Sequence, residues 1–376
     1  MIASAAARLL IQCVREPAAR DDMAIATAAE AVRDWTAVPP LALRHGVTAY
    51  VRAGLARCAP QANARAESAL KRDELAEVAG VLLLDVALTR TLAALRDRGI
   101  AAVVLKGPVL SRYLYPDRAL RPYRDVDLVV RAGEFDAAAD TILGMEFVEV
   151  PYEAEVARAA FESSGAEEPF HRMFISGSER ALVELHADPL QLGLRPADEE
   201  ERWRRVREAP HLGPGALVLA DEDQLVQLCV HAHKHGFSRL IWLKDLDLFV
   251  RLRGDGLDWD RVEVVARREG VKASVWYALS LAGDLLGTPA TPAVRMAPAP
   301  PVRWLYERVW PRRVVAELDA GMRRRAVQFH VAESWRGMLP SVVLMGRRRD
   351  RLRLVWRSLR SGSTETQPAT NGHGTT

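Results

Sequence analysis

Two aspartates, Asp125 and Asp127, stand two positions apart at the start of an apolar run that ends at Val130. Side chains two apart on a β-strand point to the same face, so both carboxylates are expected on one side of a sheet, at one end of it. Such a pair binds hard divalent cations, because magnesium accepts one or two carboxylates together with substrate phosphates. Two metals together stabilise the attacking and the leaving oxygens of a phosphoryl displacement. A solvated acidic strand end carries the same short motif, which is common by chance.

The chain before this motif has the pattern of a strand, a helix and an approach that is rich in arginine. Residues 100–105 form a continuous apolar run with β-branched members, which indicates a buried strand, and Lys106 and Gly107 follow it directly. A helix is expected from Pro108, which suits a first helical turn, until Pro116 ends it. The arginines of the approach are Arg118, Arg121 and Arg124.

Later segments extend the expected sheet. A helix at 134–143 and a strand at 147–150 complete a β-α-β-α-β unit. Two further strand-like runs, at 170–175 and 181–186, are joined by residues 176–180, whose composition is that of a hairpin turn. We therefore predict an α/β (α+β) fold with a small mixed sheet, flanked by helical regions at both ends.

This arrangement resembles the uncharacterised bacterial nucleotidyltransferases of the polymerase-beta-like superfamily. Their pattern is Leu-Lys-Gly, then Tyr-Pro and an arginine, then Asp-hydrophobic-Asp-Leu-hydrophobic-Val. It is present here as Leu105-Lys106-Gly107, Tyr115-Pro116, Arg121 and residues 125–130. The resemblance covers most of residues 41–252 and, more loosely, the arginine-rich C-terminal helices.

The resemblance implies a polymerase-beta-like core, Mg²⁺ or Mn²⁺ as cofactor, and a nucleoside triphosphate such as ATP as donor. A nucleoside monophosphate would pass to an acceptor hydroxyl while pyrophosphate leaves. The resemblance also implies a nucleotide-contacting role for Arg121. The acceptor stays open among small molecules, peptides, proteins and RNA, since the fold and the donor chemistry do not determine it.

The superfamily places a third carboxylate on a neighbouring strand, and Glu184 is the candidate. It shares a strand face with His186, and Glu-Leu-His resembles the family's acidic-Leu-His motif. Glu184 would join Asp125 and Asp127 as a metal ligand and catalytic carboxylate. The structural alternative is the polar face of an edge strand, and Asp188 is the weaker substitute.

One departure from the superfamily pattern concerns the phosphate contacts. Gly-Ser or Gly-Gly usually follows the first strand, whereas this chain has Gly107-Pro108, so a serine contact to the triphosphate is missing. Lys106 is expected to substitute for it, and Gly107 would let the backbone approach phosphate closely. The departure also motivates an alternative, a catalytically inactive module of the same fold that binds a nucleotide or a protein.

A second polar cluster comes later in the chain. His231 and His235 are four apart and would share a helical face, a spacing that also binds zinc, although no third ligand of the required kind stands nearby. We rank a contact to phosphate or base, and simple helix packing, above metal binding. Asp245 and Asp247 copy the first acidic motif, but on a helix residues two apart diverge by roughly 200° and cannot chelate together. The resemblance places Asp245 alone in the cleft.

Composition indicates a soluble, cytoplasmic, globular protein with 49% apolar residues and a net charge of +3. Its three cysteines lack disulfide or zinc-knuckle spacing, the N-terminus reads as a helix and not as a signal peptide, and no apolar run approaches the ~20 residues that span a bilayer.

Residues 303–360 carry fifteen arginines against five acids. Nucleic-acid binding is nevertheless not favoured, because a charge run is usually a solvated helix face and, among the arginines at 347–360, only Trp356 is interleaved to stack on bases.

Six segments are expected along the chain. They are an N-terminal helical region at 1–97, a nucleotidyltransferase core at 98–190, a helical region closing the cleft at 191–288, a proline-rich linker at 289–302, basic C-terminal helices at 303–360 and a disordered tail at 361–376.

Overall fold

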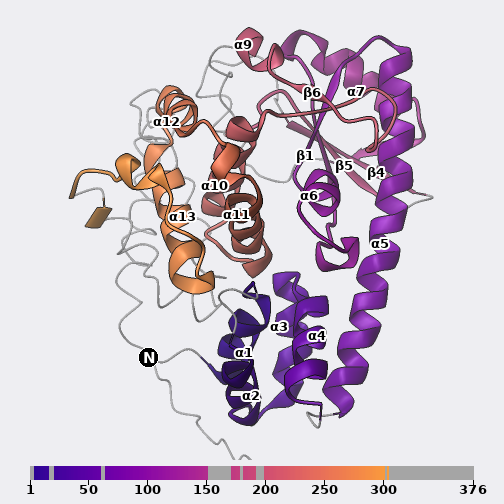
Figure 1. Ribbon diagram of the computed structural model, residues 1–376. Helices are drawn as coiled ribbons and strands as arrows, with labels where there is room; N and C mark the ends of the chain where they lie inside the picture. The colour runs from indigo at the N-terminus through magenta and orange to yellow at the C-terminus, as the bar shows by residue number, and fades with distance from the viewer. Residues whose placement is uncertain are drawn as a thin grey trace, which may run out of the picture.

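A computed structural model describes residues 4–16, 21–60, 64–150, 171–177, 181–191, 199–300 and 303–304. Its centre is a mixed seven-stranded sheet in the order β3-β4-β5-β2-β1-β7-β6, with helices packed around it (Figure 1). This confirms the predicted fold class. The strands are β1 (Ala102–Leu105), β2 (Val126–Val129), β3 (Phe147–Val150), β4 (His171–Ser176), β5 (Leu182–His186), β6 (Arg207–Glu208) and β7 (Ala216–Val218).

The middle of the sheet combines parallel and antiparallel pairs. Strand β2 runs antiparallel to β1 and parallel to β5, while β4 is antiparallel to both β5 and β3. These five strands coincide with the predicted apolar runs. Strands β6 and β7 lie in a stretch that we expected to be helical, and β7 extends the sheet by running parallel to β1. With two and three residues, they are too short to produce a readable alternation.

Helices make up most of the remaining described chain. They are α1 (Ala5–Val14), α2 (Asp22–Glu30), α3 (Val38–His45), α4 (Thr48–Cys58), α5 (Ala64–Asp97), α6 (Gly107–Tyr113), α7 (Phe135–Leu143), α9 (Glu199–Trp203), α10 (Asp221–Lys234), α11 (Leu240–Arg253), α12 (Trp259–Arg268) and α13 (Lys272–Leu286). Short 3₁₀ turns lie at Trp35–Ala37, Arg118–Leu120, Ala132–Glu134, Gly254–Gly256 and Pro292–Met296. In Figure 1, α5 runs the length of the molecule from the N-terminal helices to the sheet.

The two faces of the sheet differ in what covers them. Val126 and Leu128 point into an apolar core with α5 and α7, as do Val183 and Leu185 of β5. Because side chains alternate along a strand, Asp127, Glu184 and His186 point to the opposite face. Only a small apolar cluster, which includes Val103, Leu105 and Val129, lies on that side. The central strands thus carry their polar side chains on this face.

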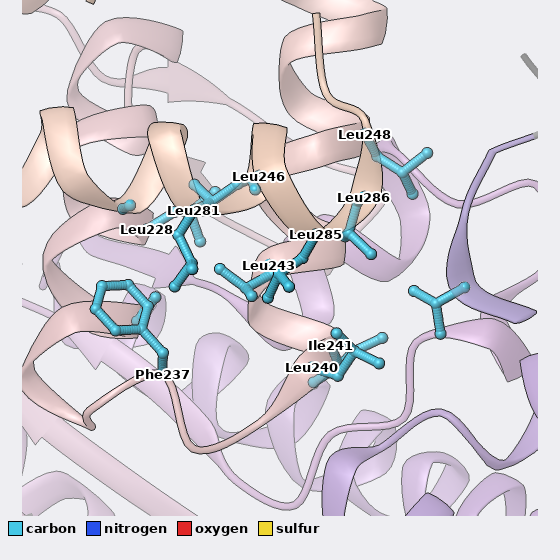
Figure 2. Close-up of a cluster of buried hydrophobic side chains, with 14 of the residues drawn as sticks. Leu228, Phe237, Leu240, Ile241, Leu243, Leu246, Leu248, Leu281, Leu285 and Leu286 are labelled. Atoms are coloured by element: carbon cyan, nitrogen blue, oxygen red, sulfur yellow. The ribbon is translucent and has the colours of Figure 1, made fainter. Parts of the chain in front are cut away.

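The N-terminal helices and the helices after the sheet share one hydrophobic core. Leu9 and Val51 belong to the same buried cluster as Leu243, Phe249 and Tyr277, although roughly half the chain separates them. Figure 2 shows the part of this core between α10, α11 and α13. Helices predicted as two separate segments therefore stabilise one another.

The proline-rich stretch is not extended throughout. Its 3₁₀ turn buries Ala293 and Met296, each only 2% exposed, and packs against α12 and α13. Beyond it the structure describes only Arg303 and Trp304. The expected basic helices and the tail otherwise lie outside the described residues.

Among the residues that the structure describes, α5 is the one helix long and apolar enough to cross a membrane by length and composition. Sequence analysis expected no such segment. Core helices of soluble proteins pass the same test, so a single such helix carries little weight, although only 39% of the apolar stretch of α5 is buried against the rest of the chain. The indication of a membrane span is therefore weak.

Candidate functional site

The register of the central strands brings the predicted carboxylates together. Asp127 of β2 lies opposite Glu184 of the parallel strand β5 and opposite Leu105 of β1. Asp125 directly precedes β2, two residues from Asp127, so their carboxylates share a face. Burial, and then the charge of Asp127, raise the pKa of Asp125 to about 6. Negative charge is therefore concentrated at one end of β2.

Lys106 is the nearest cation to this pair. Its Nζ lies 2.7 Å from Asp127 Oδ1, and only 9% of the lysine side chain and 2% of the aspartate side chain are exposed. Burial alone would raise the pKa of Asp127, but the Lys106 charge and a hydrogen bond with His186 lower it to about 2. Asp127 is therefore ionised at neutral pH.

The backbone of Lys106 is strained. Its φ is 52°, in a region that non-glycine residues rarely adopt and that costs about 1–3 kcal/mol. Backbone strain of this kind is found where the surrounding structure holds a side chain in one position. Here the strained turn between β1 and α6 directs the Lys106 ammonium to Asp127.

Two histidines surround Glu184. His171 Nε2 lies 3.2 Å and His186 Nε2 lies 3.6 Å from Glu184 Oε2, and the two imidazole rings stack with centroids 4.5 Å apart. Burial opposes ionisation of Glu184, yet the bonds with the two histidines and the Lys106 charge hold its pKa well below the usual range. His186 Nε2 is also 3.1 Å from Asp127 Oδ1, which links both carboxylates.

Sequence analysis missed three members of the cluster. Gln191 donates from Nε2 to Asp127 Oδ1 at 2.8 Å, and its Oε1 accepts hydrogen bonds from both Lys106 and Lys234. Burial and the Lys106 charge lower the pKa of Lys234 to about 7. Lys234 lies inside the His-x-x-x-His motif and could have been noticed there. Gln191 and His171 belong to no sequence motif that indicates a functional site.

Arg121 and Asp245, both expected at the nucleotide, bind each other. The pair is bidentate, with Nε to Oδ1 at 2.6 Å and Nη2 to Oδ2 at 2.7 Å, and the Tyr115 hydroxyl donates to the same carboxylate at 2.7 Å. Arg121 is 4% exposed and Asp245 is 1% exposed. This ion pair connects the segment that precedes β2 with helix α11.

The prediction that Asp245 and Asp247 lie on a helix and diverge is confirmed by α11. Asp247 is fully buried with partners of its own: Arg251 Nε donates to it, as does the Thr288 hydroxyl, each at 2.8 Å. Lys244 Nζ lies 3.2 Å from its other oxygen. This second acidic motif therefore stabilises the helical core and is separate from the carboxylates of β2.

His231 and His235 contact each other and Trp242. The His231–His235 ring centroids are 4.7 Å apart, and Trp242 lies 4.9 Å from His231 and 5.2 Å from His235. Burial, followed by the charge of Lys106, lowers the pKa of His231 well below its ordinary value, so this imidazole is neutral. Within the described ranges, three ligands converge only at His171, Glu184 and His186, away from this pair.

The family model described as uncharacterised nucleotidyltransferase matches residues 31–287, more than half of the chain. The chain belongs to this family. The match takes in every residue of the cluster around Asp127 as well as the Arg121–Asp245 pair. Among curated proteins none matches the chain.

In this member of the family, Gly107 has a packing role that its sequence context did not reveal. A Cβ at this position would lie 2.5 Å from Tyr123 Cβ and 2.7 Å from Tyr123 Cγ, much closer than any ordinary contact. Tyr123 belongs to the segment that leads into β2 and is 5% exposed. A glycine at this position therefore lets the turn after β1 pack against the approach to Asp125.

Replacing Gly107 with alanine is expected to destabilise the fold by about 1–3 kcal/mol, the usual cost of overpacking a filled site. The matched control is Gly80→Ala on α5, where a Cβ would meet nothing within 4 Å. That substitution should stabilise the protein by roughly 0.5–1 kcal/mol, because alanine is the better helix former. Chemical denaturation of both variants measures the difference. Equal stability for Gly107→Ala and the native chain would contradict the close Tyr123 contact.

The chemistry of the site fits a hard divalent cation. Asp125, Asp127 and Glu184 supply carboxylate oxygens from one end of adjacent strands, and Mg²⁺ prefers such donors in combination with water and phosphate. Burial raises the pKa of Asp125, and the neighbouring charge of Asp127 raises it further, so the two carboxylates repel each other. A bound cation would relieve that repulsion.

Proposed function

We propose that this chain transfers a nucleoside monophosphate from a nucleoside triphosphate to an acceptor hydroxyl, with Asp125, Asp127 and Glu184 holding Mg²⁺ or Mn²⁺. The observation that carries the proposal is the register of Asp127 with Glu184, which, together with Asp125 two residues before Asp127, puts three carboxylates on the same face of the sheet. When bound, two such cations neutralise charge on the attacking and leaving oxygens of a phosphoryl displacement. Asp127 and Glu184, with their lowered pKa values, are ionised and ready to bind them.

The triphosphate needs cationic partners because the serine of the superfamily pattern is absent. Lys106 and Lys234 both donate to Gln191 Oε1, so two ammonium groups lie beside the carboxylates with one amide oxygen between them. Their mutual repulsion contributes to the lowered pKa of Lys234. A polyanion placed between them would relieve it, and we assign these lysines to the triphosphate. His231 and His235 remain candidates for contacts to phosphate or base.

Proton uptake tests the triphosphate site without knowledge of the acceptor. At pH 8 the Lys234 amine, with a pKa of about 7, is mostly neutral, and a neighbouring phosphate raises its pKa. Binding of a non-hydrolysable nucleoside triphosphate with Mg²⁺ should therefore take up as much as about one proton. Calorimetry in buffers of different ionisation enthalpy measures this number.

The variant Lys234→Met should bind the nucleotide more weakly and without that uptake. Lys272→Met serves as the control, since Lys272 pairs with Glu263 at 3.1 Å on the surface of the helical region. Equal uptake by the native chain and Lys234→Met would remove Lys234 from the site. Tight nucleotide binding without pyrophosphate release in the presence of small-molecule, peptide, protein and RNA acceptors would favour the alternative of an inactive binding module.

A further inference from the structure

Three side chains on one face of β4 and β5 lie close together. His171 and His186 are register partners on adjacent strands, and Glu184 precedes His186 by two residues, so all three lie on one face. One oxygen or nitrogen atom from each lies within 4.8 Å of the others. The imidazoles stack nearly parallel, with 7° between their planes, so both Nε2 atoms reach the same carboxylate.

Two of the three distances among these atoms match the spacing of ligands around a small metal ion. Ligand atoms about 2.0–2.1 Å from a tetrahedral zinc ion lie about 3.3–3.4 Å from one another. Glu184 Oε2 is 3.2 Å from His171 Nε2 and 3.6 Å from His186 Nε2. All three ligand atoms lie within 4.8 Å of one another, so an ion could bind after adjustment of the side chains.

His186 Nε2 lies close to three polar groups of the cluster. It is 3.1 Å from Asp127 Oδ1 and 3.0 Å from Gln191 Nε2, both hydrogen-bond distances, and 3.6 Å from Glu184 Oε2, which is beyond hydrogen-bond range. An imidazole nitrogen carries one proton or one lone pair, so it donates to Asp127 or accepts from Gln191, and neither state bonds Glu184. A divalent cation between His186, His171 and Glu184 would satisfy all three at once.

We propose that His171, Glu184 and His186 form a site for a zinc-class divalent ion with a fourth position open to water or substrate. Two imidazoles and one carboxylate suit Zn²⁺, Co²⁺ or Fe²⁺ and are poor donors for Mg²⁺, which prefers oxygen. This site adjoins the proposed magnesium site, because His186 contacts Asp127 and because Glu184 belongs to both sites. It rests on the geometry of the three side chains and holds whether or not the chain transfers nucleotides.

Cobalt provides the direct test because Co²⁺ replaces zinc and absorbs visible light according to its coordination. The full chain, stripped with a chelator, should bind one Co²⁺ with the d–d absorption of a four- or five-coordinate ion, in the presence of excess Mg²⁺. Zn²⁺ should abolish the absorption at one equivalent. His171→Ala should weaken Co²⁺ binding by at least about 100-fold, beyond what loss of an outer-shell partner costs. His211→Ala, an exposed histidine away from the cluster, should bind as the native chain does.

Two further measurements keep the test decisive. Zinc-edge X-ray absorption of the native chain should report two imidazole ligands, a readout that does not depend on any variant folding. Asp125→Asn should retain Co²⁺ binding even where it loses nucleotide turnover, so the metal site and the proposed reaction can fail separately. Absence of stoichiometric Co²⁺ binding, or equal affinity for His171→Ala and the native chain, would overturn the proposal and leave the histidines as hydrogen-bonding partners of the two carboxylates.

Discussion

Asp125→Asn and Asp127→Asn should each abolish magnesium-dependent release of pyrophosphate while leaving the protein folded. Each substitution removes one charged oxygen ligand and preserves the shape of the side chain. Loss of a group that stabilises the transition state typically lowers kcat by about 10²–10³-fold, and loss of a metal ligand should cost at least that much. In Asp127→Asn, an amide oxygen can still accept from Gln191 at the position of Oδ1. Pyrophosphate release and thermal unfolding, measured on the same samples, separate the two effects.

Asp140→Asn is the control for this pair. Asp140 is an exposed carboxylate on α7, the helix that covers the opposite face of the sheet. Its substitution should change neither turnover nor stability. Native turnover by Asp125→Asn or Asp127→Asn with a true acceptor would show that the carboxylates of β2 are not the catalytic metal ligands.

Breaking the Arg121–Asp245 ion pair should cost about 3–5 kcal/mol of folding free energy, because the remaining charge is left buried without a partner. Asp245→Leu leaves the Arg121 guanidinium without its carboxylate partner in a residue that is 4% exposed, and it also removes the acceptor of the Tyr115 hydroxyl. The double variant Arg121→Met, Asp245→Leu should recover much of the loss, since apolar residues of similar volume often replace a buried pair without penalty. Denaturant unfolding of the single and double variants gives the coupling energy.

An exposed pair provides the comparison. Glu263 and Arg267 are one helical turn apart on α12, 2.7 Å from each other, with 66% of the arginine side chain exposed. Replacing Arg267 with alanine should cost far less than breaking the buried pair, because an exposed ion pair one helical turn apart contributes little to stability. A similarly small loss of stability for Asp245→Leu would mean that Arg121 and Asp245 do not form a buried ion pair. Both residues would then again be candidates for direct contacts to the nucleotide, as predicted from the sequence.

Local sequence patterns predicted the elements that carry the carboxylates. Continuous apolar runs marked β1 and β2 because both strands are buried, and the spacing of leucines identified α11 and thereby separated Asp247 from the site. The alternation of side chains along a strand predicted that Asp125 and Asp127 share one face, and that Glu184 and His186 share one face. The family resemblance supplied the pairing of Glu184 with the aspartates, which the register of β2 and β5 then provided.

Contacts between distant segments were beyond this reasoning. Arg121 and Asp245 are 124 residues apart, and either side chain alone resembles a ligand-binding group. Gln191 and Lys234 join the cluster only because β5 and α10 come together in space, and His171 joins it only through the register of β4 with β5. Register depends on the packing of a whole sheet face and not on a local pattern. The polar partners of a site are therefore harder to predict than its strands.

A crystal structure of the chain with Mn²⁺ and a non-hydrolysable nucleoside triphosphate would locate the catalytic ions, because manganese can be identified by its anomalous scattering. We expect at least one manganese ion bound by Asp125 and Asp127, with the triphosphate between that ion and Lys106 and Lys234. Manganese and triphosphate bound together elsewhere, for example at His231 and His235, with the carboxylates of β2 uncoordinated, would contradict this expectation.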